Sequence, residues 1–298
     1  MNFSLVIMAG GLGSRYGGLK QVDSFGPNNE SLLDYSIYDA LKTGFNQIVI
    51  LSSLNLKGYF INKYKKKFEK IQNCNLEVVI QDPNYGLEKY NLPKSRKKPW
   101  GTGHAVLCCE NAINNSFCII NADDFYGRNA FVKIIESLKY IEKNKIQACV
   151  VSYLIENTLS SYGGVSRGIC ETNKNHLLSI KETHELKING SIINGKLNDV
   201  NVKYPLGTEV SMNLIGFQKT IFNKLRGNFL EFLSDNLNSP KNEFLIPDLV
   251  NDLIKDKVYV QKTKENWFGV TYQADKKLVI KKIRELIKIG KYPNNLWI

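Results

Sequence analysis

Short apolar runs alternate with segments of helical periodicity along the first half of the chain. Such runs predict buried strands, and apolar residues three and four apart predict helices that pack one face on a sheet. We expect strands at residues 3–8, 48–51, 76–80, 117–120 and 148–154, and helices that begin near Ser31 and cover 104–114 and 130–141. This alternation indicates an α/β architecture.

The second half of the chain has a different pattern. Asn189-Gly190 and Asn194-Gly195 are dipeptides typical of hairpin turns, so antiparallel ribbons are expected within residues 177–200. A strand is expected at 210–217, with helices at 220–233 and 275–289. We therefore predict a mixed, mostly parallel central sheet flanked by helices, together with an antiparallel subregion.

Composition narrows the class of protein. The chain has 298 residues, of which 43% are hydrophobic and 23% charged, as in soluble globular proteins. No stretch approaches the roughly 20 apolar residues of a membrane helix, so we expect a cytoplasmic protein without a membrane partner. The six cysteines include no Cys-x-x-Cys pair, which makes a zinc site improbable and favours buried, reduced thiols.

The net charge of +12 suits either a nucleic acid or a small polyphosphate. Lysines cluster at residues 63–67 and 94–98, but no nucleic-acid-binding motif accompanies them. We expect solvated basic surfaces and no nucleic-acid partner. The stretch 83–99 is charged and poor in apolar residues, which predicts a long loop of a kind that often serves function.

A glycine-rich loop directly follows the first predicted strand, with the sequence Met8-Ala9-Gly10-Gly11-Leu12-Gly13-Ser14-Arg15. Glycines let the backbone approach a ligand and direct N–H groups at it, and the Arg15 side chain adds a fork suited to phosphate oxygens. The segment is neither a dinucleotide fingerprint, because Tyr16 stands at the last glycine position, nor a P-loop, because Leu19 follows Gly18.

This loop, with Lys20-Gln21 shortly after it, resembles the signature loop of the sugar-1-phosphate nucleotidyltransferases, also called NDP-sugar pyrophosphorylases. Further similar segments are Gln81, the run 100–107, Asn121-Ala122-Asp123-Asp124, and 161–165. The run 100–107 is most similar to the base-recognition segment of glucose-1-phosphate uridylyltransferases. The similar segments extend over about residues 5–280.

The resemblance implies a Rossmann-like nucleotidyltransferase fold in one domain, 1–298, with a nucleotide-binding half at 1–155 and an acceptor-binding half with C-terminal helices at 156–298. It implies Arg15, Lys20 and Asp123 as catalytic residues. The implied nucleotide-binding residues are Ala9, Gly10, Gly11, Gly13, Ser14, Arg15, Gln81, Gly101 and Thr102. The implied acceptor-binding residues are Tyr162, Gly163, Gly164, Glu182 and Asn213.

The implied reaction joins a nucleoside monophosphate from an NTP to a phosphorylated sugar or related small phosphate, and it releases pyrophosphate. UTP is favoured, while dTTP and CTP stay open. The expected cofactor is Mg²⁺, and Asp123 suits it as ligand because this residue follows a predicted strand at the sheet edge where open α/β sheets bind ligands. The expected partners are an NTP and a small phosphorylated acceptor, and a homo-oligomer is possible.

Two positions depart from the family pattern. Gly269 stands where the family often has a second metal-binding aspartate, and Thr183 stands where a lysine would follow Glu182 and hold the acceptor phosphate. We therefore expect an acceptor other than glucose 1-phosphate, such as a modified sugar phosphate or a phosphorylated amino alcohol. Its phosphate would need another cation. The candidates are Lys181, Lys203 and, if the loop 83–99 folds over the acceptor, Lys94, Arg96, Lys97 or Lys98.

Other classes of function remain as alternatives to this hypothesis. One is a cytidylyltransferase that acts on a non-sugar phosphate. A metal-dependent glycosyltransferase of similar fold would use Asp123 and Asp124 as metal ligands, but it would have no use for a triphosphate-binding loop. A non-catalytic nucleotide sensor or a basic nucleic-acid-binding protein would show no Mg²⁺-dependent turnover.

Overall fold

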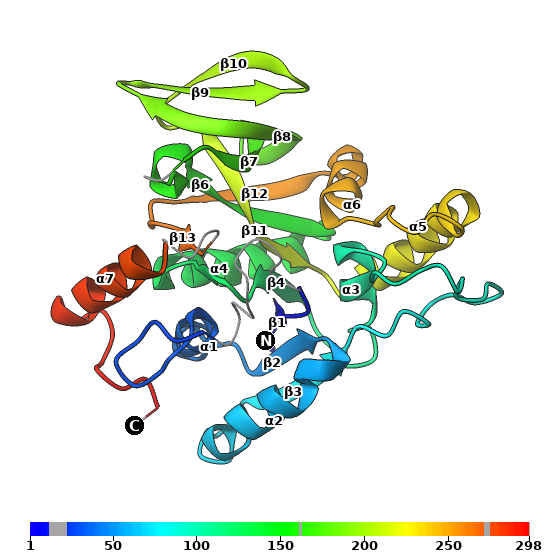
Figure 1. Cartoon of the computed structure of the whole chain (residues 1–298), viewed down its shortest axis with the longest axis horizontal. Coiled ribbons are helices and arrows are strands. Elements are labelled where there is room, and N and C mark those ends of the chain that lie inside the picture. The colour runs from blue at the N-terminus through cyan, green and yellow to red at the C-terminus, as the bar shows by residue number, and fades with distance from the viewer. Residues whose placement is uncertain (12–22, 161–162, 271–274, 298) are drawn as a thin grey trace.

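The computed structural model describes residues 1–11, 23–160, 163–270 and 275–297. Its main feature is one continuous sheet in the order β10-β9-β8-β12-β6-β11-β4-β1-β2-β3, with β7 paired to both β8 and β11. Figure 1 shows this sheet running from the β9–β10 hairpin to β3. The strands are β1 (Ser4–Met8), β2 (Gln47–Ser52), β3 (Asn75–Ile80), β4 (Phe117–Asn121), β5 (Asp124–Phe125), β6 (Ala148–Leu154), β7 (Val165–Asn173), β8 (His176–Asn189), β9 (Ile192–Leu197), β10 (Val200–Pro205), β11 (Glu209–Phe217), β12 (Val258–Thr263) and β13 (Phe268–Gly269).

The sheet is mixed, as predicted. Strands β3, β2, β1 and β4 run parallel to one another, and β6 runs parallel to β12. Strand β11 is antiparallel to β4, β6 and β7, and the strands β7 to β10 form an antiparallel extension. A single sheet therefore contains strands from both halves of the chain.

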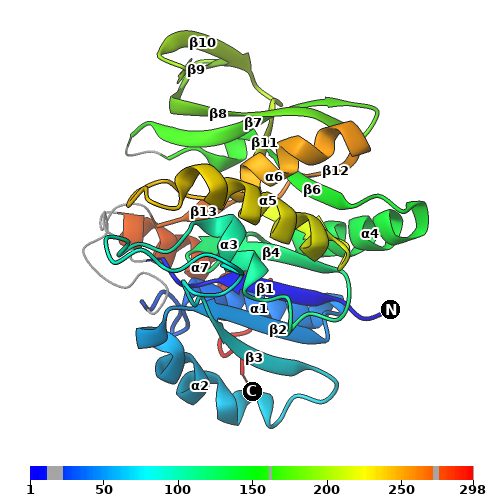
Figure 2. The ribbon, with the colours of Figure 1, turned by 90° about the vertical axis from the view of Figure 1, so that its right-hand side faces the viewer.

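Helices cover both faces of the sheet. The strands β1 and β2 are buried on both sides, as expected of parallel strands with helical layers. On one face Leu5 and Ile7 pack with residues of α1, α2 and α4, and on the other Val6 packs with residues of α3, α5 and α6. Figure 2 shows the second of these layers in front of the sheet. The helices are α1 (Leu32–Thr43), α2 (Leu54–Phe68), α3 (Thr102–Leu107), α4 (Arg128–Asn144), α5 (Ile221–Asn236), α6 (Ile246–Leu253) and α7 (Asp275–Lys288).

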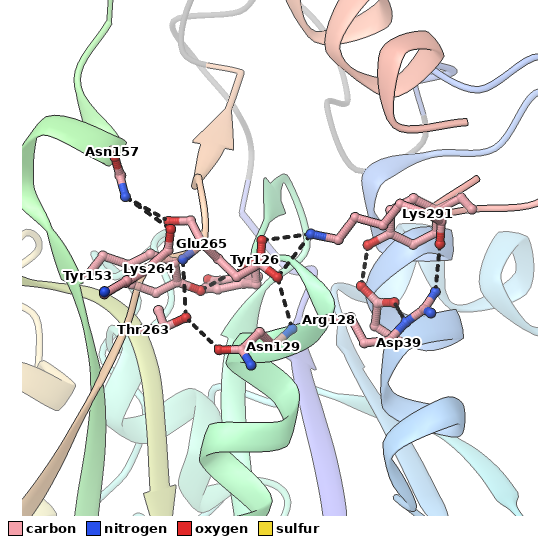
Figure 3. Close-up of polar contacts among 11 residues, drawn as sticks. Asp39, Tyr126, Arg128, Asn129, Tyr153, Asn157, Thr263, Lys264, Glu265 and Lys291 are labelled. Carbon is pink, nitrogen blue, oxygen red and sulfur yellow. Dashed lines mark hydrogen bonds and ion pairs between the residues drawn. The ribbon is translucent and has the colours of Figure 1, made fainter. Parts of the chain in front are cut away.

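The C-terminal segment is tied to the body of the protein by a polar network (Figure 3). The carboxylate of Glu265 accepts a hydrogen bond from the backbone N–H of Asn129 at 3.1 Å and pairs with the Lys291 ammonium at 2.8 Å. Arg128 donates to the Lys291 carbonyl at 3.0 Å and pairs with the buried carboxylate of Asp39 at 2.9 Å. These contacts hold the chain beyond α7 against the start of α4, close to the short strands β5 and β13.

Some expected elements differ from the structure. Asn194-Gly195 lies inside β9, and the second hairpin turn instead falls at Asn198 and Asp199, which both adopt positive φ angles of 49° and 63°. Asn and Asp tolerate this left-handed conformation better than most residues, so they can replace the Asn-Gly signal. The helix expected at 104–114 ends at Leu107 and continues as turns.

Helix α2 and the strands β7 and β12 were not anticipated from the sequence. In α2 the lysines at 63 and 65–67 stand on both sides of Tyr64 in the sequence. They obscure the single buried stripe of Leu56, Phe60 and Tyr64. Within the described part of the chain, no helix has the length and apolar character needed to cross a membrane.

Candidate active site

The site forms where β1 and β4 end side by side. Met8 and Asn121 are the last residues of these parallel strands and lie opposite each other in the ladder. Met8 lines a cavity of about 370 Å³, and Asn121 lines a second cavity of about 510 Å³. The carboxyl ends of adjacent parallel strands thus bring two hollows together at the edge where α/β sheets bind ligands.

The smaller cavity brings together several residues expected to bind the nucleotide. Its lining includes the predicted residues Gly10, Gly11, Gln81, Gly101 and Thr102, together with Pro99 and Glu243, which the sequence did not indicate. Lys98, which was considered as a cation for the acceptor phosphate, lines this cavity and not the larger one.

The side chain of Gln81 is held in one orientation in this cavity. Its amide nitrogen donates to the Gly101 carbonyl at 3.0 Å and lies 3.3 Å from Nδ1 of the buried His104. Nε2 of His104 lies 3.0 Å from the Tyr85 carbonyl, which can only accept, so this nitrogen carries the proton and Nδ1 accepts from Gln81. The Oε1 atom of Gln81 then remains on the side of Gly10 and can accept a hydrogen bond from a ligand.

Burial lowers the pKa of His104 to about 4, so its imidazole is neutral at physiological pH. The neutral form is the one that can accept from Gln81 while it donates to Tyr85. Burial and the hydrogen bonds therefore both favour the neutral imidazole.

Gly101 is required by the local backbone. Its φ is 98°, and a β-carbon there would lie 2.5 Å from the Phe244 carbonyl. The close approach lets the Gly103 N–H donate to Phe244 at 2.8 Å, and the Phe244 N–H donate to Trp100 at 2.7 Å. The start of α3 is thereby attached to the segment that leads into α6.

The loop 83–99 packs beside the smaller cavity and does not cover an acceptor in the larger one. Arg96 is buried, and its guanidinium donates to four backbone carbonyls, of Lys98, Pro99, Ser239 and Asn242, at 2.8–3.1 Å. The same group stacks 3.8 Å above the Trp100 ring. Arg96 thus fixes the loop, and the hypothesis of a basic lid over the acceptor is wrong for this residue.

The larger cavity contains most of the acidic groups of the site. Asp123, Glu182 and Asn213, all predicted from the sequence, line it. The lining also includes Arg167 and Asp248. Asn213 reaches the cavity because β11 bulges between Ser211 and Ile215, where Asn213 adopts a φ of 60°.

Asp124 also lines this cavity, although it is buried. Its carboxylate accepts from the Asn121 side-chain amide at 2.9 Å and from the Tyr126 hydroxyl at 3.3 Å. Burial, and next the negative charge of Asp123, raise the pKa of Asp124. A cation bound beside the two carboxylates would offset this repulsion.

No group of three or more His, Cys, Asp or Glu side chains arranged to hold a metal occurs among the described residues. Mg²⁺ does not need such a group, because it commonly takes one or two carboxylates together with water and substrate phosphates. The pair Asp123 and Asp124, with oxygen ligands only, fits that donor set.

The other predicted residues either lie outside the described part of the chain or line neither cavity. Gly13, Ser14, Arg15, Lys20 and Tyr162 lie outside the described residues. Ala9 is buried and donates its N–H to the Leu51 carbonyl at 2.8 Å. Gly163 and Gly164 do not reach the larger cavity. Gly164 instead permits close packing, because a β-carbon there would lie 2.9 Å from Cα of Glu185.

Sequence reasoning missed Arg167, Ser166 and Asp248 in the larger cavity. A signal existed for two of them, since Ser166-Arg167 directly follows the Tyr-Gly-Gly-Val segment that was singled out. Asp248 lies in the first turn of α6, an element that was not anticipated.

Comparison with known proteins identifies the class. The sequence matches the Nucleotidyl transferase family over residues 4–188, so the chain belongs to this family and is an enzyme that transfers nucleotidyl groups. A search of curated proteins found no significant match.

Two solved structures have a similar fold. One is described as a glucose-1-phosphate thymidylyltransferase from Bacillus anthracis, with 14% identity, a TM-score of 0.63, and coverage of 95% of this chain and 96% of that one. The other is an inositol-1-phosphate CTP transferase from T. maritima, with 13% identity, a TM-score of 0.61 and the same coverage of both chains. The predicted family and fold class are thereby confirmed.

Proposed function

We propose that the protein transfers a nucleoside monophosphate from a pyrimidine NTP, with UTP favoured, to a small phosphorylated acceptor and releases pyrophosphate. The observation that carries this proposal is the pair of adjoining cavities at the ends of β1 and β4. The NTP base would occupy the smaller cavity beside Gln81, and the acceptor would occupy the larger one beside Glu182. The α-phosphorus would then lie near the Met8–Asn121 edge, between the two cavities.

The roles of the individual residues follow from this placement. Oε1 of Gln81 would accept from the N3–H group of uracil or thymine, or from the amino group of cytosine. Mg²⁺ held by Asp123, with Asp124 beside it, would supply charge stabilisation of the transferring phosphate. Arg15 and Lys20 are proposed to neutralise the triphosphate. Chemistry of this kind depends mostly on positioning and charge, so no covalent role is assigned to the protein.

The acceptor is proposed to differ from glucose 1-phosphate. Thr183 is fully buried and does not line the larger cavity, so the position of the family lysine contributes no charge there. Four carboxylate residues, Asp123, Asp124, Glu182 and Asp248, line this cavity. They suit an acceptor with several hydroxyl groups or an amino group, such as a modified sugar phosphate or a phosphorylated amino alcohol.

The test is a matrix of UTP, dTTP, CTP, ATP and GTP against sugar 1-phosphates and phosphorylated amino alcohols, with pyrophosphate release as the readout. We expect release with a pyrimidine nucleotide, and about 10²-fold slower release with the Asp123→Asn variant. CTP as the best donor with an amino alcohol phosphate would identify the cytidylyltransferase alternative. Absence of release from every pair would refute the proposal, and turnover of a nucleotide diphosphate sugar would then indicate a glycosyltransferase.

A further inference from the structure

The position expected to carry the acceptor-binding lysine lies inside the protein. The Thr183 hydroxyl lies 3.2 Å from the Tyr204 hydroxyl and 3.3 Å from the Lys181 carbonyl, and the side chain has no exposed surface. The Thr183 side chain therefore does not line the larger cavity. The acceptor phosphate therefore needs a cation from another position.

Arg167 lies directly opposite Thr183 in the antiparallel pair of β7 and β8. It lines the larger cavity, and it is the one lysine or arginine among the described residues that does so. Residues that face each other across two strands lie within about 5 Å at their β-carbons. A positive charge absent from position 183 is thus present on the neighbouring strand, next to Glu182.

The guanidinium of Arg167 is held in place by the protein. Nε donates to the Thr158 hydroxyl at 3.2 Å, Nη1 donates to the Ser166 carbonyl at 2.7 Å, and Nη2 donates to the Thr158 carbonyl. The group also lies 4.6 Å from the centre of the Trp267 ring. Three of its five N–H donors are used in this way, so one N–H on each terminal nitrogen has no hydrogen-bond partner among the described residues.

The charge and shape of Arg167 suit a phosphate. Burial lowers its pKa to about 10, which still leaves the guanidinium protonated near pH 7. Two free N–H groups in one plane can bind two oxygens of a phosphate, which a lysine ammonium does less specifically. The Asp124 and Glu182 carboxylates act electrostatically on it from the same cavity.

The other cations considered for this role lie elsewhere. Arg96 is bonded to four carbonyls beside the smaller cavity. Lys181 is exposed on β8 and Lys203 belongs to the β9–β10 hairpin, and neither lines the larger cavity.

We propose that Arg167 binds the phosphate group of the acceptor, in place of the lysine that the family has at the position of Thr183. The inference rests on the proposed function for the identity of the acceptor cavity. It adds that the acceptor phosphate is bound by a residue of β7, whereas the position of the family lysine lies on β8.

The test uses the full chain and compares Arg167→Met, Arg167→Gln and Arg167→Lys with the wild type. Met removes the charge and keeps an apolar stem against Trp267, Gln is neutral but can still donate to Thr158, and Lys keeps the charge without the fork. Lys181→Met is the matched control, because it removes a nearby cation outside the cavity. Steady-state pyrophosphate release gives KM separately for the acceptor and the NTP, with the best pair from the matrix above.

We expect both neutral variants to raise the acceptor KM 10- to 100-fold while the KM for the NTP changes less than twofold. The acceptor KM of Arg167→Lys should lie between those of the neutral variants and the wild type. The acceptor KM of Lys181→Met should equal that of the wild type. If one neutral variant does not fold, as judged by thermal melting and circular dichroism, the other decides. An unchanged acceptor KM, or an equal rise of both KM values, would overturn the inference.

Calorimetric binding of the same phosphorylated compounds, without NTP, separates this inference from the proposed function. If no pair in the matrix releases pyrophosphate but a phosphorylated compound binds the wild type at least 10-fold more tightly than Arg167→Gln, the proposed function fails and the inference stands. Equal binding to the wild type and Arg167→Gln overturns the inference, whatever the turnover. No detectable binding of any phosphorylated compound to the wild type overturns it as well.

Discussion

Gly269 lies directly opposite Asp124 in the β5–β13 pair, and a β-carbon at position 269 would come within 2.5 Å of Oδ1 of Asp124. The Trp267 ring would lie 2.9 Å from the added β-carbon. Because Asp124 is buried and hydrogen-bonded to Asn121 and Tyr126, its carboxylate has little room to withdraw. The observed position of the Asp124 carboxylate thus requires a residue without a β-carbon at position 269.

Gly269→Ala is therefore expected to lower turnover at least 10-fold and to destabilise the fold by about 1–3 kcal/mol, the usual cost of overpacking. Pyrophosphate release and urea denaturation measure the two effects. Gly227→Ala is the matched control, since a β-carbon there meets nothing within 4 Å in the exposed face of α5 and should leave activity unchanged. Full activity of Gly269→Ala would mean that Asp124 is free to move.

Asp123→Asn should reduce turnover by about 10²-fold, because loss of one transition-state charge contact typically costs about 3 kcal/mol. It should also raise the Mg²⁺ concentration that gives half-maximal rate. Asp124→Asn should have the smaller effect on the Mg²⁺ requirement, since Asp124 already has two protein hydrogen-bond donors. A Mg²⁺ titration of both variants decides the ranking, and the reverse order would assign the metal to Asp124.

Gln81→Met should raise the KM for the NTP by about 10- to 100-fold, because the variant keeps the volume of the side chain but removes one base contact of about 1–3 kcal/mol. The Gly101 carbonyl and Nδ1 of His104 would also lose their donor. The acceptor KM, measured in the same assay, should stay within twofold. A change confined to the acceptor would contradict the placement of the base in the smaller cavity.

The stability of the protein should fall as the pH decreases from about 6.5 towards 4. The imidazole of His104 has a folded-state pKa of about 4, below its unfolded value of about 6.5, so the unfolded state binds the proton more readily over this range. The contribution is fully present above pH 6.5, and its complete loss would amount to about 3 kcal/mol. Chemical denaturation at a series of pH values measures the trend.

The His104→Gln variant serves as the comparison for this prediction. It should be less stable than the wild type at pH 7.5, because Gln reproduces the imidazole hydrogen bonds poorly, but its stability should depend less on pH. The difference in unfolding free energy should therefore shrink towards pH 5. Parallel pH curves for the two proteins would show that His104 does not titrate in this window.

The sequence indicated more of the lining of the smaller cavity than of the larger one, for a physical reason. Buried parallel strands such as β1 and β4 are continuous apolar runs, and glycines or acids directly after them fall at the ligand-binding edge. Asp123 could therefore be placed at this edge from the strand before it, whereas Gln81 and Gly101 were expected from the resemblance to the family. Arg15 and Lys20 lie outside the described residues, so their roles stay predictions.

The lining of the larger cavity depends on strand register, which the sequence does not specify. That Arg167 faces Thr183 follows from the pairing of β7 with β8, which includes shifts after Val165 and after Glu171. Polar residues alternate only loosely along β8, so no hydrophobic pattern fixes which residues lie opposite each other. The bulge that directs Asn213 into the cavity likewise depends on the pairing of β11 with β6 in the folded sheet.

The chain of hydrogen bonds from Tyr85 through His104 to Gln81 has a consequence for how a nucleotide would bind. The conformational entropy of the Gln81 side chain is lost when the protein folds, so little of it remains to be lost on association. Such preorganisation favours selectivity, because Oε1 of Gln81 cannot rotate to suit a base that offers no donor. It also couples base choice to the loop that carries Tyr85, so variants that loosen this loop should first relax nucleotide selectivity and only later reduce affinity.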